Sequence, residues 1–233
     1  MKPVTKNKKP VVCLGIDTSL GVIDIVAVAA AGSSTVAKED KRIRKIAEEY
    51  RTGKTWPFHL ETELADAVTT VIGKLNNKPE AVAINLGPGS YTSLRSGLAF
   101  LKGWYLAEKA KTGKEPFVIV GVNGLSALAQ LAGFEVFQEE RNNRYWRLIK
   151  SKKGDPAAKV ELIEKNATVP TESGQALSKN AAIRMLPKVS SYVNIGKRKY
   201  RMGEIIASAG IKSYTEKALQ KQDTLKPIYA KMR

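Results

Sequence analysis

The chain has 233 residues, 43% of them hydrophobic, so it is long enough to bury a substantial core and is not disordered throughout. Lysine and arginine number 39 against 22 acidic residues, a formal net charge of +17. This excess favours phosphate-rich or acidic partners, although a solvated lysine-rich surface would give the same count. The single cysteine excludes an internal disulfide, and the single histidine excludes a metal site with two imidazole ligands from one subunit.

The sequence begins with a basic arm and continues in short apolar runs. Residues 1–10 are expected to be flexible, and the apolar run that follows is too short to cross a membrane. Runs rich in valine, isoleucine and alanine predict strands over 11–16 and 22–31. A third short strand is predicted at 35–38. Charge dominates 39–58, which is therefore predicted to be a solvated helix or loop.

Two helices are predicted on either side of a short buried strand at 81–86. The first covers 60–75, where apolar residues recur at helical spacing. The second begins at Ser90, which can cap it, and continues to about residue 110. Small residues four positions apart leave one face of this second helix without bulk, namely Ala99, Gly103 and Ala107.

The second half of the sequence is less regular. A strand is predicted at 117–122, followed by a helix that ends near residue 132. A hairpin is predicted over 135–151, and residues 171–186 have a helical pattern. Two basic runs, at 141–153 and 197–201, contain no acidic residue.

Two glycine-bearing turns after apolar strands are candidate ligand loops. The first, Asp17-Thr18-Ser19, could hold a phosphate or a hydrated magnesium ion, and an ordinary turn explains it equally well. The second, residues 87–90 (GPGS), could direct helix N-terminal amides at an anion. It lacks the Gly-Lys-Ser/Thr ending of a Walker loop. Arg95, one turn into the helix, could support an anion or bond a neighbouring carbonyl.

Nucleophilic catalysis is not indicated. His59 stands at the start of a predicted helix, where histidine more often caps or packs than catalyses. Neither Ser19 nor Ser90 lies in the small-x-serine-x-small elbow of the α/β hydrolases. Serine–histidine chemistry would need one of these serines together with the single histidine, so we expect none.

The motifs together resemble those of the TsaB family. The resemblance rests on GIDTS after the first strand, GPGSYTSLRSGLAFLKGWYLA opening a helix, and VGVNGLSALA after the next strand, and it covers residues 11–129. Thr92 and Arg95 match the family, whereas Ser93 replaces its usual glycine. The resemblance implies an α/β fold of the actin-like ATPase and ribonuclease-H-like type, with two lobes of mixed sheets flanked by helices.

The resemblance also implies a division of the chain. A first actin-like lobe with partner-binding helices would span 11–113, and a divergent or reduced second lobe would span 114–233. The sequence PIY at 227–229 is similar to the family's closing Pro-Leu-Tyr. We therefore expect the C-terminal segment to return to the first lobe.

The function implied by the resemblance is that of a non-catalytic scaffold. In this family TsaB binds TsaD, which holds its metal with paired histidines and carries out threonylcarbamoyl transfer to tRNA. This chain would be cytoplasmic, without catalytic residues, a metal or a cofactor of its own. Its partners would be a TsaD-like subunit, a TsaE-like ATPase and tRNA as the substrate of the complex. ATP and magnesium would be bound mainly by the partner proteins. A homodimer in isolation is a further expectation, and an actin-fold ATPase or small-molecule kinase using Asp17 for magnesium is the alternative.

Three groups of site residues follow from these arguments. An apolar ridge and a shallow groove on the two helices would bind the partner, so Val68→Asp is expected to abolish binding and leave the fold intact. The candidate vestigial nucleotide site comprises Asp17, Thr18, Ser19, Gly87, Gly89 and Ser90. The candidate partner interface comprises His59, Leu64, Val68, Ile72, Leu75, Ala99, Gly103 and Ala107, and the candidate RNA contacts are Arg141, Arg144, Arg147, Lys197, Arg198 and Lys199.

Overall fold

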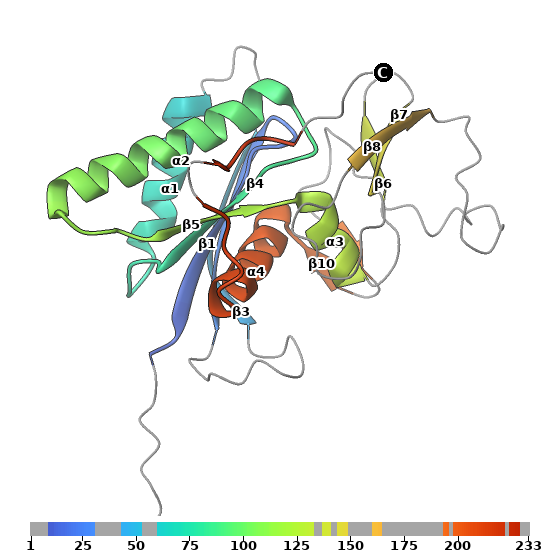
Figure 1. Cartoon of the computed structure of the whole chain (residues 1–233). Helices are drawn as coiled ribbons and strands as arrows, with labels where there is room; N and C mark the ends of the chain where they lie inside the picture. Colours follow the sequence, from blue (N-terminus) through green and yellow to red (C-terminus); the bar gives the residue numbers. More distant parts are fainter. Residues whose placement is uncertain are drawn as a thin grey trace, which may run out of the picture.

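A five-stranded mixed sheet forms the centre of the protein (Figure 1). The computed structural model describes residues 9–30, 43–52, 60–132, 137–140, 144–148, 160–164, 193–195, 198–221 and 224–228. The strand order is β3-β2-β1-β4-β5, with the first two pairs antiparallel and the last two parallel. The strands are β1 (Val11–Asp17), β2 (Val22–Ala30), β3 (Ile43–Thr52), β4 (Ala81–Asn85) and β5 (Val118–Val122).

Helices cover both faces of this sheet. On one face lie α1 (Leu60–Gly73) and α2 (Tyr91–Thr112), which contact each other. On the other lie α3 (Gly124–Ala132) and α4 (Met202–Thr215), and α4 crosses β1, β2 and β4. Among the described residues, every helix is too short or too polar to cross a membrane.

The central strands are apolar along their whole length because both of their faces are covered. In β1, Leu14 and Ile16 belong to the core beneath α1 and α2, whereas Cys13 belongs to the core beneath α4. Successive side chains of a strand point to opposite faces, so one strand supplies both cores. The predicted strands at 11–16, 22–31 and 81–86 are confirmed on this basis.

The prediction for the charged stretch 39–58 is wrong. Residues 43–52 form β3, an edge strand that pairs with β2 along its length. Ala47 is buried, and Ile46 packs against the core, while Arg44 and Lys45 are exposed. Charged residues are common on edge strands, where they hinder pairing with another chain. The predicted strand at 35–38 lies outside the described residues.

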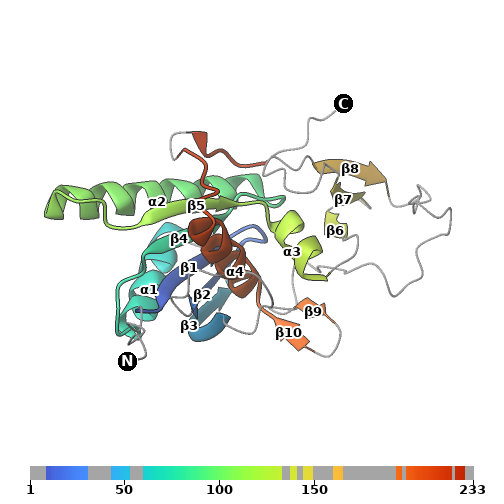
Figure 2. The ribbon, with the colours of Figure 1, turned by 60° about the horizontal axis from the view of Figure 1, so that its bottom comes forward.

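Two smaller sheets accompany the central one. A three-stranded antiparallel sheet comprises β6 (Phe137–Glu140), β7 (Arg144–Leu148) and β8 (Val160–Glu164), and it lies beyond α3 (Figures 1 and 2). A hairpin comprises β9 (Val193–Ile195) and β10 (Arg198–Tyr200). The hairpin predicted over 135–151 is confirmed as β6 and β7. The helix predicted at 171–186 lies outside the described residues, and so do residues 1–8 of the predicted arm.

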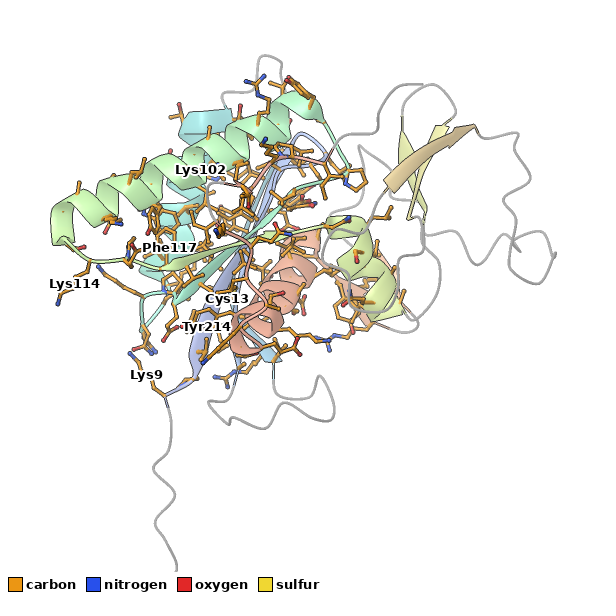
Figure 3. The ribbon with its side chains drawn as sticks, viewed as in Figure 1. Lys9, Cys13, Lys102, Lys114, Phe117 and Tyr214 are labelled. Atoms are coloured by element: carbon orange, nitrogen blue, oxygen red, sulfur yellow. The ribbon has the colours of Figure 1, made fainter. Side chains whose placement is uncertain are left out.

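The C-terminal segment packs against the central sheet. Leu225 is buried in the same core as Leu86, and the N–H of Ile228 donates to the carbonyl of Leu86 at 2.7 Å. The Lys102 ammonium group of α2 donates to the carbonyl of Leu225 at 3.4 Å, and Figure 3 shows this side chain beside the segment. The segment therefore fastens α2 to the end of β4. Whether the chain divides into lobes at residue 113 stays a prediction.

Small residues let α4 approach the sheet closely. A Cβ atom at Gly15 of β1 would overlap the backbone of Gly203 and Ala207 in α4. A Cβ atom at Gly210 would overlap Ala83 of β4 and would lie 3.2 Å from the sulfur of Cys13. The helix backbone thus rests directly on the strands, without intervening side chains.

We predict that Gly15→Ala destabilises the protein by about 3 kcal/mol, because backbone atoms of α4 cannot move aside as a flexible side chain can. Urea unfolding followed by circular dichroism measures the loss. Gly73→Ala is the matched control, since a Cβ atom there meets nothing within 4 Å. Equal stabilities of the two variants would contradict the close packing of α4.

Candidate functional site

Asp17, the last residue of β1, has a carboxylate that is bonded inside the protein. The residue is 1% exposed. One carboxylate oxygen accepts hydrogen bonds from the side-chain amide of Asn85 at 2.7 Å and from the N–H of Ser19 at 3.0 Å. Burial raises the pKa of Asp17, and these hydrogen bonds oppose the rise. Asp17 is therefore a buried acid with neutral donors around it.

Asn85 connects the three segments that meet at this end of the sheet. Its side-chain oxygen accepts hydrogen bonds from the N–H of Gly87 at 2.9 Å and from the N–H of Gly124 at 3.1 Å. Its amide nitrogen donates to Asp17. The side chain thus joins β1, the 87–90 loop and the start of α3. The sequence motifs alone give Asn85 no role, although its place as the polar last residue of an apolar strand is a signal that points to it.

The two candidate ligand loops contact each other directly. The N–H of Ser90 donates to the carbonyl of Ser19 at 2.6 Å, and a Cβ atom at Gly89 would overlap the backbone of Ser19. The hydroxyl of Thr18 donates to the carbonyl of Ser93 at 2.9 Å. The polar groups predicted to bind a phosphate are thus engaged within the protein.

The first turn of α2 also differs from the prediction. Ser90 is the N-cap residue, but its hydroxyl makes no capping hydrogen bond and instead accepts one from the hydroxyl of Ser93 at 3.1 Å. The guanidinium of Arg95 donates to the Tyr91 hydroxyl at 2.8 Å and lies 5.1 Å from the centre of its ring. Arg95 therefore contacts Tyr91, one turn earlier on its own helix.

The described residues contain no group of three or more histidine, cysteine, aspartate or glutamate side chains that could hold a metal ion. Asp17, Ser19 and Asn85 form a buried, hydrogen-bonded polar cluster. The arrangement can hold the strand ends and loops together. Among the described acids, only Asp24 lies beside Asp17, so a magnesium site with two carboxylates would have to use this pair.

The predicted apolar ridge on α1 needs correction. Leu64 is fully buried and Val68 is 3% exposed, both in the core between α1 and the sheet, and Ile72 and Leu75 pack against that core. An amphipathic helix covers its own sheet with its apolar stripe, so this ridge faces inward. Val68→Asp would place a charge in this core and disrupt the fold, whereas the sequence led us to expect a loss of partner binding with the fold intact. His59 lies outside the described residues.

The predicted small-residue face of α2 is exposed. Ala99, Gly103 and Ala107 all lie at the surface, and a Cβ atom at Gly103 would meet nothing within 4 Å. Two large side chains of the same helix are also exposed, Tyr91 at 54% and Leu106 at 63%. Alongside them, α1 exposes Thr62, Asp66, Thr69 and Gly73.

The candidate RNA contacts are only partly described. Arg198 and Lys199 lie exposed on β10, where Arg198 pairs with Glu204 at 3.1 Å and stacks 4.6 Å from the ring of Tyr200. Arg144 and Arg147 lie on β7. Arg141 and Lys197 lie outside the described residues.

Sequence comparison finds no matching protein-family model and no matching curated protein. Structural comparison finds YeaZ (TsaB) from Pseudomonas aeruginosa, with a TM-score of 0.59 at 13% identity, covering 94% of this chain and 99% of that one. A protein described as uncharacterized, with similarity to peptidase YeaZ from Pseudomonas aeruginosa, matches with a TM-score of 0.57 at 13% identity, over 95% and 100% of the two chains.

The class of protein is thus an α/β protein of the actin-like, ribonuclease-H-like fold, as the sequence resemblance implied. Within that class, the chain shares the fold of YeaZ over nearly its whole length. At this level of identity the similarity concerns the fold, and the role of each site residue has to be argued from this chain.

We predict that Asn85→Ala lowers the free energy of unfolding by about 3 kcal/mol, because it removes the side-chain acceptor of the buried Gly87 N–H and leaves the Asp17 carboxylate with the Ser19 N–H but without the Asn85 donor. Thermal or urea unfolding measures the change. Asn76→Ala, at an exposed position, should change stability by less than about 0.5 kcal/mol. Similar effects of the two substitutions would contradict the central role of Asn85.

Proposed function

We propose that this chain is a non-catalytic subunit that binds a TsaD-like catalytic partner for threonylcarbamoyl transfer to tRNA adenosine next to the anticodon. Two kinds of support converge on this role. The sequence motifs resemble those of the TsaB family, and the fold is that of YeaZ. The site at Asp17, where an enzyme of this fold class would bind its ligand, is bonded internally in this chain.

The observation that carries the proposal is the exposed face of α2. Ala99, Gly103 and Ala107 offer no side-chain bulk, so a helix of a partner can come close to the backbone. Tyr91 and Leu106 are large exposed side chains of the same helix and supply apolar area, which partner surfaces concentrate in a few large side chains. These five residues, and not the buried stripe of α1, form the surface that we propose for the partner.

The rest of the proposed complex supplies what this chain does not. ATP and magnesium would bind mainly to the TsaD-like subunit and to a TsaE-like ATPase. The tRNA would contact basic residues of this chain as an accessory surface, with Arg198 and Lys199 of β10 as its described members. Without a partner, the α2 face of one copy would pair with that of another by two-fold symmetry. All of these components act in the cytoplasm.

The second candidate function is an ATPase or small-molecule kinase that uses Asp17 for magnesium. It requires the 17–19 and 87–90 loops to separate around a phosphate, whereas Ser90 and Ser19 are joined by a backbone hydrogen bond. It also requires Asp17 to exchange the donors Asn85 and Ser19 for a hydrated cation. These contacts favour the non-catalytic role.

Calorimetry on the isolated chain separates the two functions. We expect no heat of binding when magnesium and ATP are titrated at micromolar protein concentration, and no release of phosphate. Asp17→Asn, which keeps a polar side chain of the same shape, serves as the comparison. Micromolar binding with turnover by the wild-type chain, lost in this variant, would establish the enzyme.

We predict that Gly103→Arg weakens binding to a TsaD-like partner at least tenfold, because it fills the α2 face with a long charged side chain. The isolated variant should be more stable than wild type by about 0.5–1 kcal/mol, since the position is open and glycine is unfavourable within a helix. Co-purification and calorimetry with the partner measure binding, and thermal unfolding measures stability.

The matched control is Gln130→Arg, which adds the same charge at an exposed position of α3 on the opposite face of the sheet. It should bind the partner as wild type does. If Gly103→Arg also retains full affinity, the partner surface lies elsewhere on the chain.

A further inference from the structure

Two buried carboxylates face each other where β1 ends and β2 begins. Asp17 and Asp24 are direct partners in the antiparallel register of these strands, so their side chains lie on the same face of the sheet. This is the face that α4 covers, and the two residues are 1% and 2% exposed. The role proposed above uses neither of these acids.

Asp24 holds the beginning of α4 against the sheet. One of its carboxylate oxygens accepts the N–H of Gly203, in the first turn of α4, at 3.0 Å. The other lies 3.3 Å from the guanidinium of Arg201, the N-cap residue of that helix. Arg201 directly follows β10, so Asp24 fastens the junction between β10 and α4 to β2.

The charges around this junction are not balanced. The same guanidinium also pairs with Glu48 of β3 at 3.3 Å and lies 4.8 Å from the ring centre of Tyr50. Glu204 of α4 has its own partner, Arg198 of β10. Glu48 also pairs with Lys45 at 2.8 Å, so Arg201 is the described cation that pairs with Asp24, while the described donors to Asp17 are neutral.

A buried carboxylate without full compensation keeps its proton. Burial raises the pKa of Asp24 to about 7; the Gly203 hydrogen bond and Arg201 oppose the rise, and the charge of Asp17 adds to it. Burial raises the pKa of Asp17 as well. Because Asp17 is the cross-strand partner of Asp24, its negative charge makes the loss of the Asp24 proton harder.

We propose that the Asp17–Asp24 pair is a proton-controlled joint between the central sheet and the β10–α4 junction, closed while the pair holds a proton and loosened when the proton leaves. The direction of the pH dependence follows from the thermodynamic linkage between proton binding and opening. Opening brings Asp24 into water, where its pKa returns towards the ordinary value of 3.8. The closed joint therefore binds the proton more tightly than the open one, and a rise in pH from about 4 to about 7 favours opening.

The consequence reaches the hairpin that precedes the helix. Loosening at Arg201 frees β10 and the first turn of α4 from β2 and β3 together, because the guanidinium contacts both strands. One released proton shifts the opening equilibrium by at most about tenfold per pH unit. This inference goes beyond the proposed partner binding and does not depend on it.

Hydrogen exchange of the full chain tests the joint. After correction for intrinsic exchange rates, the N–H of Gly203 and of Ile205 should exchange up to about 100-fold faster at pH 7 than at pH 5. Asp24→Asn should remove this pH dependence. Asp17→Asn should shift the rise in exchange rate to lower pH, because it removes the neighbouring negative charge that raises the pKa of Asp24. Asp66→Asn, an exposed acid of α1, is the control and should leave it unchanged.

Equal pH dependence in wild type and in Asp24→Asn would overturn the proposal. If Asp24→Asn does not fold, nuclear magnetic resonance of the aspartate carboxyl carbons in the wild-type chain decides instead. A titration near neutral pH for the Asp17–Asp24 pair supports the joint. Titration of both carboxyls below pH 5 overturns it.

Discussion

The structure depends on the direct contact of α4 with the central strands. Gly15 removes the side chain that would separate β1 from the helix, and Gly210 does the same over β4. This contact buries the ends of β1 and β2, and with them the carboxylates of Asp17 and Asp24. Every polar group there must then find a partner within the protein, because water is excluded.

The polar groups at this end of the sheet form hydrogen bonds within the protein, and these bonds make the site a buried polar cluster. In open α/β sheets, ligands bind beyond the carboxyl ends of the parallel strands. Here Asn85 occupies that position, and it binds Asp17 and the backbone of the next two segments. This place in the fold thus holds the two loops and the start of α3 together. The proposed interaction surface lies on the opposite face of the sheet, on α2.

The sequence predicted the elements whose patterns arise from local burial. The strands around Leu14 and Ile84 are apolar because both of their faces are covered, and α1 and α2 show helical spacing. It did not predict β3, whose charged residues resemble those of a loop until β2 is placed beside them. Nor did it distinguish the inward stripe of Val68 from the outward stripe of Gly103, since spacing alone does not say which face meets the sheet.

The sequence by itself determined the order β1, β2, α1, β4, α2, β5 and α3, the two-loop motif that resembles the TsaB family, and the absence of a two-histidine metal site in one chain. Only the tertiary structure decided what the polar residues do. Arg201 lies 177 positions after Asp24 in the sequence, and nothing in the sequence alone indicates that Asp17, Asp24 and Arg201 are buried together. Their burial beneath α4 gives them partners and shifts the pKa of the two acids, because desolvation depends on which elements cover a group.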